Sequence, residues 1–238
     1  MRLDDQSFVR GQYGSTERLC TRMSVWQPDP DRGTPQDFLV SELTGRSPSR
    51  VLEVGCGTGA LARRIAAEVG AGVVAIDSSE AMVDTARSAG VDAHLGNVEQ
   101  LPYADGEFDA AVAAWMLYHV EDLDRGLGEL ARVVRPGGCL VAVTNGTAAL
   151  AEVYEAVGGE RLGSPFSSEN GEELLARHFD SVQRTDFRPR AVFDDPAALA
   201  GYLRSLERPE LADRVNDAMG FPFVAHGAVS VFVATRSA

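Results

Sequence analysis

Two hydrophobic patterns alternate through the middle of the chain. Short apolar runs of the kind that form buried strands occur at Arg50–Val54, Gly72–Ile76, Asp92–Leu95, Asp109–Ala114 and Gly138–Thr144. Between them, apolar residues recur at helical spacing in Ala60–Val69, Ser79–Ala89 and Leu123–Val134. Strands that alternate with helices in this way predict an α/β domain whose parallel sheet is covered on both faces. Ligands of such sheets bind at the carboxyl ends of the strands.

After Asn145 the pattern becomes less regular. We expect helices, an extended segment and a closing strand at Ala148–Val157, Glu172–His178, Ser181–Asp186, Pro196–Leu206 and Val229–Thr235. The segment Gly158–Asn170 contains two adjacent glycines and Pro165, which predicts a loop. That loop is interpreted either as a lid or acceptor-binding element or as a plain surface loop.

Composition and charge indicate a globular protein and limit the kinds of partner it can have. The 238 residues are 45% hydrophobic and 24% charged, which is typical of a globular chain, and the length suits one α/β domain. Asp and Glu outnumber Lys and Arg by 35 to 22, which gives a formal net charge of −13. This charge disfavours nucleic acid as a partner. It also suggests the hypothesis that the substrate is a cationic, amine-bearing metabolite.

Cysteines and targeting signals indicate a reducing compartment. Cys20, Cys56 and Cys139 are odd in number and lack metal-ligand spacing, so we expect buried free thiols. The first residues, MRLDDQSFVRGQYG, do not resemble a signal peptide, and no apolar stretch approaches the roughly 20 residues of a membrane helix. The sequence therefore predicts a cytoplasmic protein with no membrane contact, as a monomer or homodimer.

A glycine-rich turn follows the first predicted strand. In VLEVGCGTGAL, residues 51–61, Gly55, Gly57 and Gly59 alternate with other residues just before a helix. Glycine allows a tight turn and close approach of a ligand, and the helix directs free N–H groups toward it. The pattern alone is a weak signal, because Gly55, Gly57 and Ala60 also satisfy the dinucleotide-binding fingerprint.

Asp77 ends the second predicted strand, 18 residues beyond Gly59. A carboxylate at this position can accept hydrogen bonds from two ribose hydroxyls, as both NAD and S-adenosylmethionine require. The alternative is that Asp77 caps the next helix. These residues by themselves leave the choice of cofactor open.

Four segments together carry a more specific resemblance. VLEVGCGTGALARRIA, VVAIDSSEAMVDTAR, GNVEQLPYADGEFDAAVAAWMLYHV and ELARVVRPGGCLVAV resemble the class I S-adenosylmethionine-dependent methyltransferases. The most similar group is methyltransferase type 11, which includes the ubiquinone/menaquinone-biosynthesis enzymes and many natural-product enzymes. The resemblance covers about residues 48–145, and a dehydrogenase has no reason to carry the LPYADGEFD and RPGG segments.

The resemblance implies a fold and a division of the chain. The fold is a doubly wound, Rossmann-like sheet of seven mostly parallel strands with helices on both faces and a closing antiparallel C-terminal strand. Residues 1–45 would form an N-terminal helical cap, and residues 46–238 the methyltransferase domain. Within that domain, residues 48–145 would bind the cofactor and residues 146–228 would supply acceptor-side elements.

The resemblance also assigns cofactor contacts. Glu53 and the backbone of Gly55, Cys56 and Gly57 would hold the methionine end of S-adenosylmethionine. Asp77 would take the ribose hydroxyls.

Around the adenine and the methionine ammonium the assignments are weaker. Ser78 would pack near the adenine, and Asn97 and Val98 would contact its edge. Many relatives have Asp where this chain has Asn97 and a polar residue where it has Ala114, whose carbonyl would meet the methionine ammonium. Tyr13 is either a contact to the methionine carboxylate or a surface tyrosine.

Methyl transfer needs alignment more than it needs reactive side chains. A methyl group on sulfonium is already activated, and oriented proximity contributes on the order of 7–11 kcal/mol. A general base is needed only if the acceptor must lose a proton. His119 is the candidate base, because imidazole titrates near neutrality, but the favoured interpretation is that it packs or hydrogen-bonds near the next helix. Trp115 and Tyr118 either line an acceptor pocket or pack in the core.

The sequence therefore predicts methyl transfer to a small-molecule acceptor, with secondary metabolism as the expected setting. The alternative is a protein of this fold that binds S-adenosylmethionine or its by-product and acts as a non-methylating cyclase or binding protein. A dehydrogenase and an RNA or protein methyltransferase are less consistent with the motifs and the charge. No metal is expected, because His94, His178 and His226 have no partners at ligand spacing.

Overall fold

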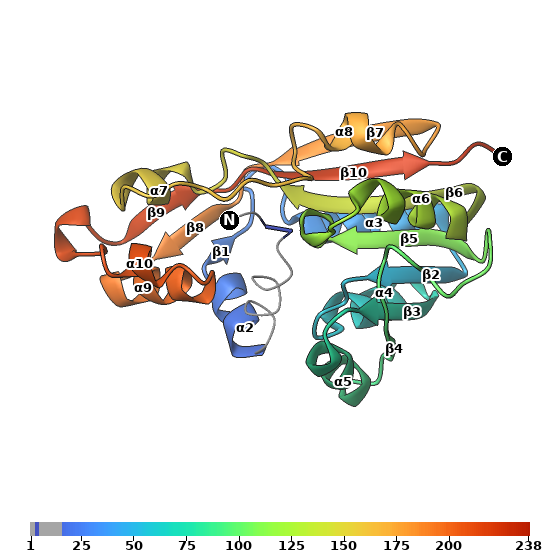
Figure 1. Ribbon diagram of the computed structural model, residues 1–238, viewed down its shortest axis with the longest axis horizontal. Coiled ribbons are helices and arrows are strands. Elements are labelled where there is room, and N and C mark those ends of the chain that lie inside the picture. Colours follow the sequence, from blue (N-terminus) through green and yellow to red (C-terminus); the bar gives the residue numbers. More distant parts are fainter. Residues whose placement is uncertain (1–2, 5–15) are drawn as a thin grey trace.

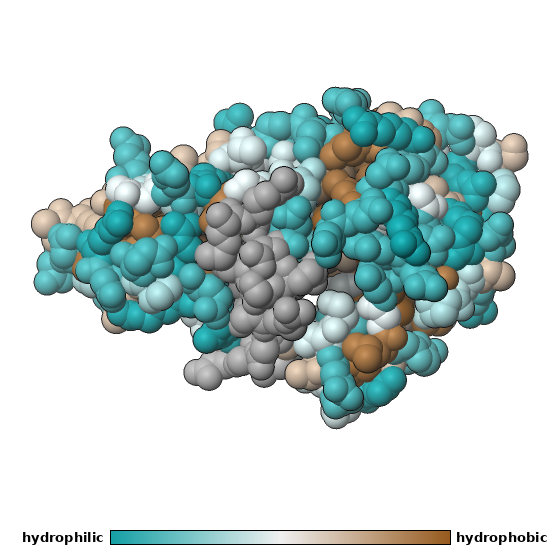
Figure 2. Space-filling view, viewed as in Figure 1, coloured by the Kyte–Doolittle hydropathy of each residue, from teal (hydrophilic) through white to brown (hydrophobic). Residues whose placement is uncertain are grey.

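The computed structural model describes residues 3–4 and 16–238, and it divides into a core and a smaller cap (Figure 1). Tyr13 lies outside the described residues. In the view of Figure 1 the core occupies the right side and the cap the left. The surface in Figure 2 is mostly hydrophilic, with small apolar patches.

The core is a seven-stranded sheet in the order β4-β3-β2-β5-β6-β10-β7. Its strands are β2 (Arg50–Val54), β3 (Gly72–Asp77), β4 (Asp92–Leu95), β5 (Phe108–Ala114), β6 (Val134–Asn145), β7 (Ser181–Phe187) and β10 (Val229–Thr235). Neighbouring strands from β4 to β6 are parallel, whereas β10 is antiparallel to both β6 and β7. This confirms the predicted fold class, including the antiparallel C-terminal strand.

Helices cover both faces of this sheet. One face carries α3 (Pro35–Arg46), α4 (Ala60–Val69) and α5 (Glu80–Ser88), and the other carries α6 (Leu123–Val133) and α8 (Gly171–Leu175). The central strand β5 reads FDAAVAA and is almost wholly buried, as expected for a parallel strand between two helical layers. The edge strand β7 instead exposes every other side chain or more, including Arg184 and Asp186.

Strand packing explains the second glycine of the RPGG segment. The added Cβ of an alanine at Gly138 would lie 2.5 Å from the Asp109 carbonyl oxygen, so only glycine lets β6 approach β5 at this point. The pairing of these strands shifts register between Phe108 and Ala110. A feature that served as a family signature is therefore also a steric requirement of the sheet.

The cap is built around a second sheet that the hydrophobic pattern did not predict. It has the antiparallel order β1-β8-β9, formed by β1 (Trp26–Gln27), β8 (Arg190–Phe193) and β9 (Phe223–His226). Its helical elements are α2 (Thr16–Ser24), α7 (Ala151–Ala156), α9 (Pro196–Ser205), α10 (Pro209–Ala212) and the 3₁₀ turn η2 (Asp217–Met219). Phe193, Leu199, Leu203 and Leu211 form its separate apolar core.

Two strand pairs connect the cap to the core. β7 leads into β8 through Arg188 and Pro189, and β9 leads into β10 through Gly227 and Ala228 (Figure 1). The Gly227 N–H donates to the Pro189 carbonyl at 2.7 Å, which locks the two connections together. The cap is therefore a continuation of the last core strands.

The N-terminal region contributes to both parts. α3 begins after Thr34, whose hydroxyl accepts from the Asp37 N–H at 3.0 Å, and it buries Leu39 and Leu43 against the core. The boundary predicted at residue 45 falls inside this helix. Among the described residues before α3, α2 and β1 pack with the cap.

The cysteine prediction is confirmed in part. Cys56 and Cys139 are buried free thiols, whereas Cys20 is exposed on α2. No helix in the described part of the chain combines the length and the apolar character needed to cross a membrane.

Candidate functional site

The glycine turn lies where β2 ends. Gly55 and Gly57 have φ angles of 69° and 52°, which favour glycine. The N–H groups of Gly55 and Cys56 donate to the Ile76 carbonyl at 2.8 and 3.0 Å, so the turn is fixed to β3. A Cβ on Gly55 would lie 2.6 Å from the Cβ of Met116. The turn therefore has little freedom to accept a larger residue.

The Asp77 carboxylate organises this turn. One oxygen accepts from the Gly57 N–H at 2.8 Å and the other from the Ser79 N–H at 2.9 Å. The N-cap of α5 is Ser79, whose hydroxyl accepts from the Met82 N–H, and not Asp77. Burial raises the pKa of Asp77, and the N–H donors of Ser79 and Gly57 oppose that rise. Each carboxylate oxygen can still accept a further hydrogen bond.

Glu53 is buried at the base of the same turn. Its side chain is 2% exposed, and Oε2 has no hydrogen-bond partner among the described residues. Burial, followed by the nearby charge of Asp77, raises the pKa of Glu53 to about 8. A buried carboxyl with an unsatisfied oxygen is a costly arrangement unless a ligand completes it. Its environment favours a cationic or hydrogen-bond-donating ligand.

The remaining predicted cofactor residues lie at neighbouring strand ends. Ser78 is exposed beside Asp77, and Val98 is buried beside the exposed Asn97. The Asn97 Oδ1 already accepts from the Glu99 N–H at 2.9 Å, in a local turn. Ala114 ends β5. All of these residues except Tyr13, which lies outside the described chain, line one cavity.

Trp115 links the ends of two strands. Its backbone has a φ of 54°, a conformation that a bulky residue rarely adopts, and its indole N–H donates to Asn145 Oδ1 at 3.2 Å. Such strained residues concentrate at functional sites. Asn145 was not predicted from the sequence as a site residue, although its place at the end of β6 makes it a candidate for one.

His119 lies in the 3₁₀ turn η1 (Leu117–His119) after β5. Its Nδ1 lies 2.8 Å from the Leu3 carbonyl, which can only accept, so Nδ1 carries the proton. Burial lowers the pKa of His119 to about 4, although the Leu3 contact opposes this. The imidazole is therefore neutral at pH 7, well below the titration range expected of a base poised near neutrality. Tyr118 packs edge-on against its ring.

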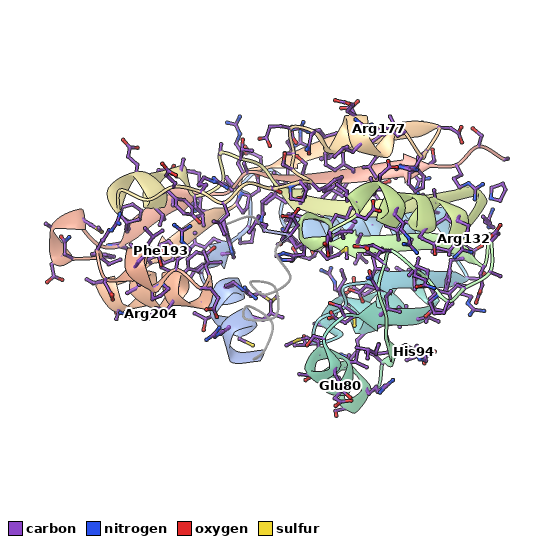
Figure 3. All side chains as sticks on the ribbon, viewed as in Figure 1. Glu80, His94, Arg132, Arg177, Phe193 and Arg204 are labelled. Carbon is purple, nitrogen blue, oxygen red and sulfur yellow. The ribbon has the colours of Figure 1, made fainter. Side chains whose placement is uncertain are left out.

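One large cavity joins these residues to the cap. It has a volume of about 1360 Å³ and is lined by the strand ends of the core on one side. The cap side includes α2, the end of β1, the predicted loop Gly158–Asn170 and α9. Four further residues of the cavity lining were not predicted from the sequence: Arg22, Tyr154, Arg161 and Tyr202. In Figure 3 the label Glu80 lies on the core and the label Phe193 on the cap.

Comparison with known proteins bears on this arrangement. A family model described as a methyltransferase domain matches residues 52–142. Malonyl-[acyl-carrier protein] O-methyltransferase of Pseudescherichia vulneris is 37% identical over 122 residues, covering 50% of this chain and 48% of the relative. Trans-aconitate 2-methyltransferase of Mycolicibacterium gilvum is 41% identical over 103 residues, covering 42% and 40%. The chain thus spans about half or less of these relatives.

The matched region, residues 52–142, identifies a methyltransferase domain of the S-adenosylmethionine-dependent kind within this chain. The solved structure of the [4+2]-cyclase SpnF has the same fold, with a TM-score of 0.61 and 21% identity over 100% of this chain and 98% of that one. At that identity the similarity concerns the fold alone.

The core end of the cavity fits the cofactor of this methyltransferase family. S-adenosylmethionine carries a sulfonium, an ammonium and a ribose, and the unsatisfied Glu53 oxygen and the Asp77 carboxylate match cations and hydroxyls. Gly55, Cys56 and Gly57 of the glycine turn line the same cavity. No group of three or more His, Cys, Asp or Glu side chains that could hold a metal occurs in the part of the chain that the structure describes.

Proposed function

We propose that this chain transfers the methyl group of S-adenosylmethionine to a small-molecule acceptor held on the cap side of the cavity. One observation carries the proposal. A single cavity is lined both by the glycine turn and Asp77 and by cap residues such as Tyr154 and Tyr202. A cofactor on the core side and an acceptor on the cap side would therefore face one another within a shared enclosure.

Each core residue has a part in holding the cofactor. Asp77 would accept hydrogen bonds from the ribose, and the backbone of Gly55–Gly57 would lie against the methionine end. Glu53 would lose its proton to meet positive charge, and Val98 would pack near the adenine with Ser78 and Asn97. Ala114 would offer its backbone at the end of β5.

The bound cofactor supplies an activated methyl group on a positively charged sulfur. The chain's contribution is to align the acceptor, to hold it close and to exclude water. The cap and core supply this enclosure, since Leu19 of α2 and Leu206 next to α9 line the cavity opposite the strand ends. Trp115, fixed by its hydrogen bond to Asn145, forms a rigid wall between the two ends.

Relatives support a small acceptor without defining it. The names of the two relatives above refer to a malonyl group on a carrier protein and to trans-aconitate. The region after Asn145, which supplies much of the cap, lies outside the family match at residues 52–142. A role in biosynthesis is part of this proposal.

The test is methyl transfer by the purified chain. The chain is incubated with S-adenosylmethionine labelled on its methyl group and with panels of carboxylates, phenols and amines. Label in an acceptor, with formation of S-adenosylhomocysteine, supports the proposal. Tight binding of S-adenosylhomocysteine with no transfer to any acceptor would favour the non-methylating alternative, and no binding would contradict both.

A further inference from the structure

Charge is distributed unequally along the cavity. The carboxylates that line it belong to the core end: Glu53, Asp77, Glu80, Glu99 and Glu121. The described residues at the cap end contribute no carboxylate to the lining but contribute two arginines, Arg22 and Arg161. A third lining arginine, Arg64, is already paired with Asp37 and Glu68 on the core side. The cap end is thus locally basic in a chain of net charge −13.

Arg161 lacks an acidic partner. Its guanidinium donates to the carbonyl oxygens of Ala149 and, at 3.2 Å, Gly146, in the segment that follows β6. No carboxylate within the described chain forms an ion pair with it. The nearby Glu169 instead accepts from the Thr147 N–H at 3.0 and 3.1 Å.

Burial makes this arrangement unfavourable unless something completes it. Arg161 is half-buried, and desolvation lowers its pKa. Carbonyl oxygens supply hydrogen bonds but no net negative charge, and Glu169, whose charge raises the pKa of Arg161, forms no ion pair with it within the described chain. A guanidinium has five N–H donors in a planar fork, and two hydrogen bonds leave donors for a ligand.

Two tyrosines complete a set of donors around this arginine. Arg161 lies over the ring of Tyr154, 5.4 Å from its centroid, and both Arg161 and Arg22 act electrostatically on Tyr202. The hydroxyls of Tyr154 and Tyr202 have no hydrogen-bond partner among the described residues, and neither is sealed from the cavity. Burial raises the pKa of both tyrosines, so both keep their protons at neutral pH.

We propose that the cap end of the cavity recognises an acceptor that bears a carboxylate, bound by Arg161 with the hydroxyls of Tyr154 and Tyr202 as further donors. The proposal deepens the methyltransferase function above and rests on it. A planar carboxylate matches the guanidinium fork and satisfies hydroxyl donors with its remaining lone pairs. The local site thus favours the opposite acceptor charge to that suggested by the overall net charge.

A purely structural role for Arg161 makes a different prediction. If Arg161 only fixed the segment of Gly146 and Ala149, its loss would affect charged and neutral ligands alike. The ratio between the affinities for matched charged and neutral ligands therefore separates recognition from support. This ratio is also independent of cofactor binding.

The experiment measures binding to the full chain saturated with S-adenosylhomocysteine, by calorimetry. The probes share one ring and differ in charge: 4-hydroxyphenylacetate, its primary amide, tyramine and phenyl phosphate. We expect the carboxylate to bind at least about tenfold more tightly than the amide, as for a charge-assisted hydrogen bond. Equal affinity for carboxylate and amide, including no binding of either, would overturn the proposal. A preference for tyramine or for phenyl phosphate would overturn it too.

Variants locate the effect. Arg161→Met should abolish the preference for carboxylate over amide while changing the affinity for S-adenosylhomocysteine by less than about twofold. The matched control is Arg204→Met. Arg204 is exposed on the same cap and is paired with Asp213, so its substitution should leave the ratio unchanged. Tyr202→Phe, which removes one hydroxyl and keeps the ring, should lower the ratio by about two- to tenfold. An unchanged ratio in both Arg161→Met and Tyr202→Phe would refute the assignment. Failure of S-adenosylhomocysteine to bind the wild type would instead contradict the methyltransferase proposal.

Discussion

The core end of the cavity presents carboxylates and fixed backbone turns, whereas the cap end presents arginines and tyrosine hydroxyls. At the core end, Asp77 is held by two backbone N–H groups and Glu53 is buried without full satisfaction. At the cap end, Arg161 is held by two backbone carbonyls and forms no ion pair within the described chain. The core end thus offers carboxyl groups to a cation, and the cap end offers a guanidinium to an anion.

This contrast shows how one cavity can bind two different ligands, one at each end. A cationic cofactor is favoured where carboxylates gather, and an anionic acceptor is favoured where arginines gather. Each ligand placed at the wrong end would meet charge of its own sign. Four substitutions at the core end and at its border test this contrast between the two ends.

Gly55→Ala should have the largest effect. The new Cβ would lie 2.6 Å from the Met116 Cβ, at a φ of 69°. Left-handed strain and overpacking together should lower stability by about 2–6 kcal/mol and weaken S-adenosylhomocysteine binding on the order of 100-fold. Gly70→Ala is the matched control, with a φ of 76° and nothing within 4 Å of the added Cβ. It should lose only the conformational part, about 1–2 kcal/mol, with unchanged affinity. Equal losses in calorimetry for the two variants would show that the Met116 contact is unimportant.

Asp77→Ala should weaken S-adenosylhomocysteine binding by about 1–3 kcal/mol, or roughly 5- to 150-fold, because polar partners are left unpaired. Asp77→Ala also removes the hydrogen bond that the Asp77 carboxylate accepts from the Gly57 N–H, which adds to the expected loss of affinity. Asp77→Asn, which keeps one acceptor oxygen, should fall between the alanine variant and the wild type in isothermal calorimetry. Unchanged affinity in both variants would contradict the ribose role. The ratio of carboxylate to amide binding at the cap should not move.

More of the core than of the cap could be predicted from the sequence, and the reasons are physical. Strands such as Arg50–Val54 and Val229–Thr235 were predicted with the bounds observed, because burial on both faces produces continuous apolar runs. Asp77 followed from its place at a strand end. The cap strands β1, β8 and β9 contain two to four residues, too few to show a period. Arg161 and Tyr202 are 41 residues apart in sequence, and only the folded cap brings them to one cavity.

Glu53→Gln should remove a pH dependence of the core end. The folded-state pKa of Glu53, about 8, lies above its ordinary value of 4.5, so the folded protein holds the proton more tightly. This stability contribution is complete below about pH 4.5 and is lost as the pH rises through about 8. The wild type without ligand should therefore lose stability over that window relative to Glu53→Gln, as measured by thermal melts at several pH values.

Cofactor binding should show the reverse slope. Positive charge on S-adenosylmethionine favours ionised Glu53, so its affinity should rise with pH up to about 8, by no more than about tenfold per pH unit for one linked proton. S-adenosylhomocysteine lacks the sulfonium and should show a shallower slope. Calorimetry in buffers of different ionisation enthalpy measures the released proton directly. Identical slopes for Glu53→Gln and the wild type would exclude Glu53 as the linked group.

His119 stands at the border between the two ends, and its substitution should have the smallest effect. With a pKa of about 4 and its Nδ1 proton donated to Leu3, the imidazole is a weak proton acceptor. A base is also unnecessary where an ionised carboxylate itself takes the methyl group. We therefore expect His119 to act as a positioning residue. His119→Ala should lower turnover by about two- to tenfold, the usual value of one hydrogen bond, and His119→Asn, whose amide can donate to the Leu3 carbonyl, should restore most of it. Rates should show no inflection between pH 6 and pH 8 from this residue. A loss of about 100-fold in both variants would instead identify His119 as the general base, and would require an acceptor that enters the cavity protonated.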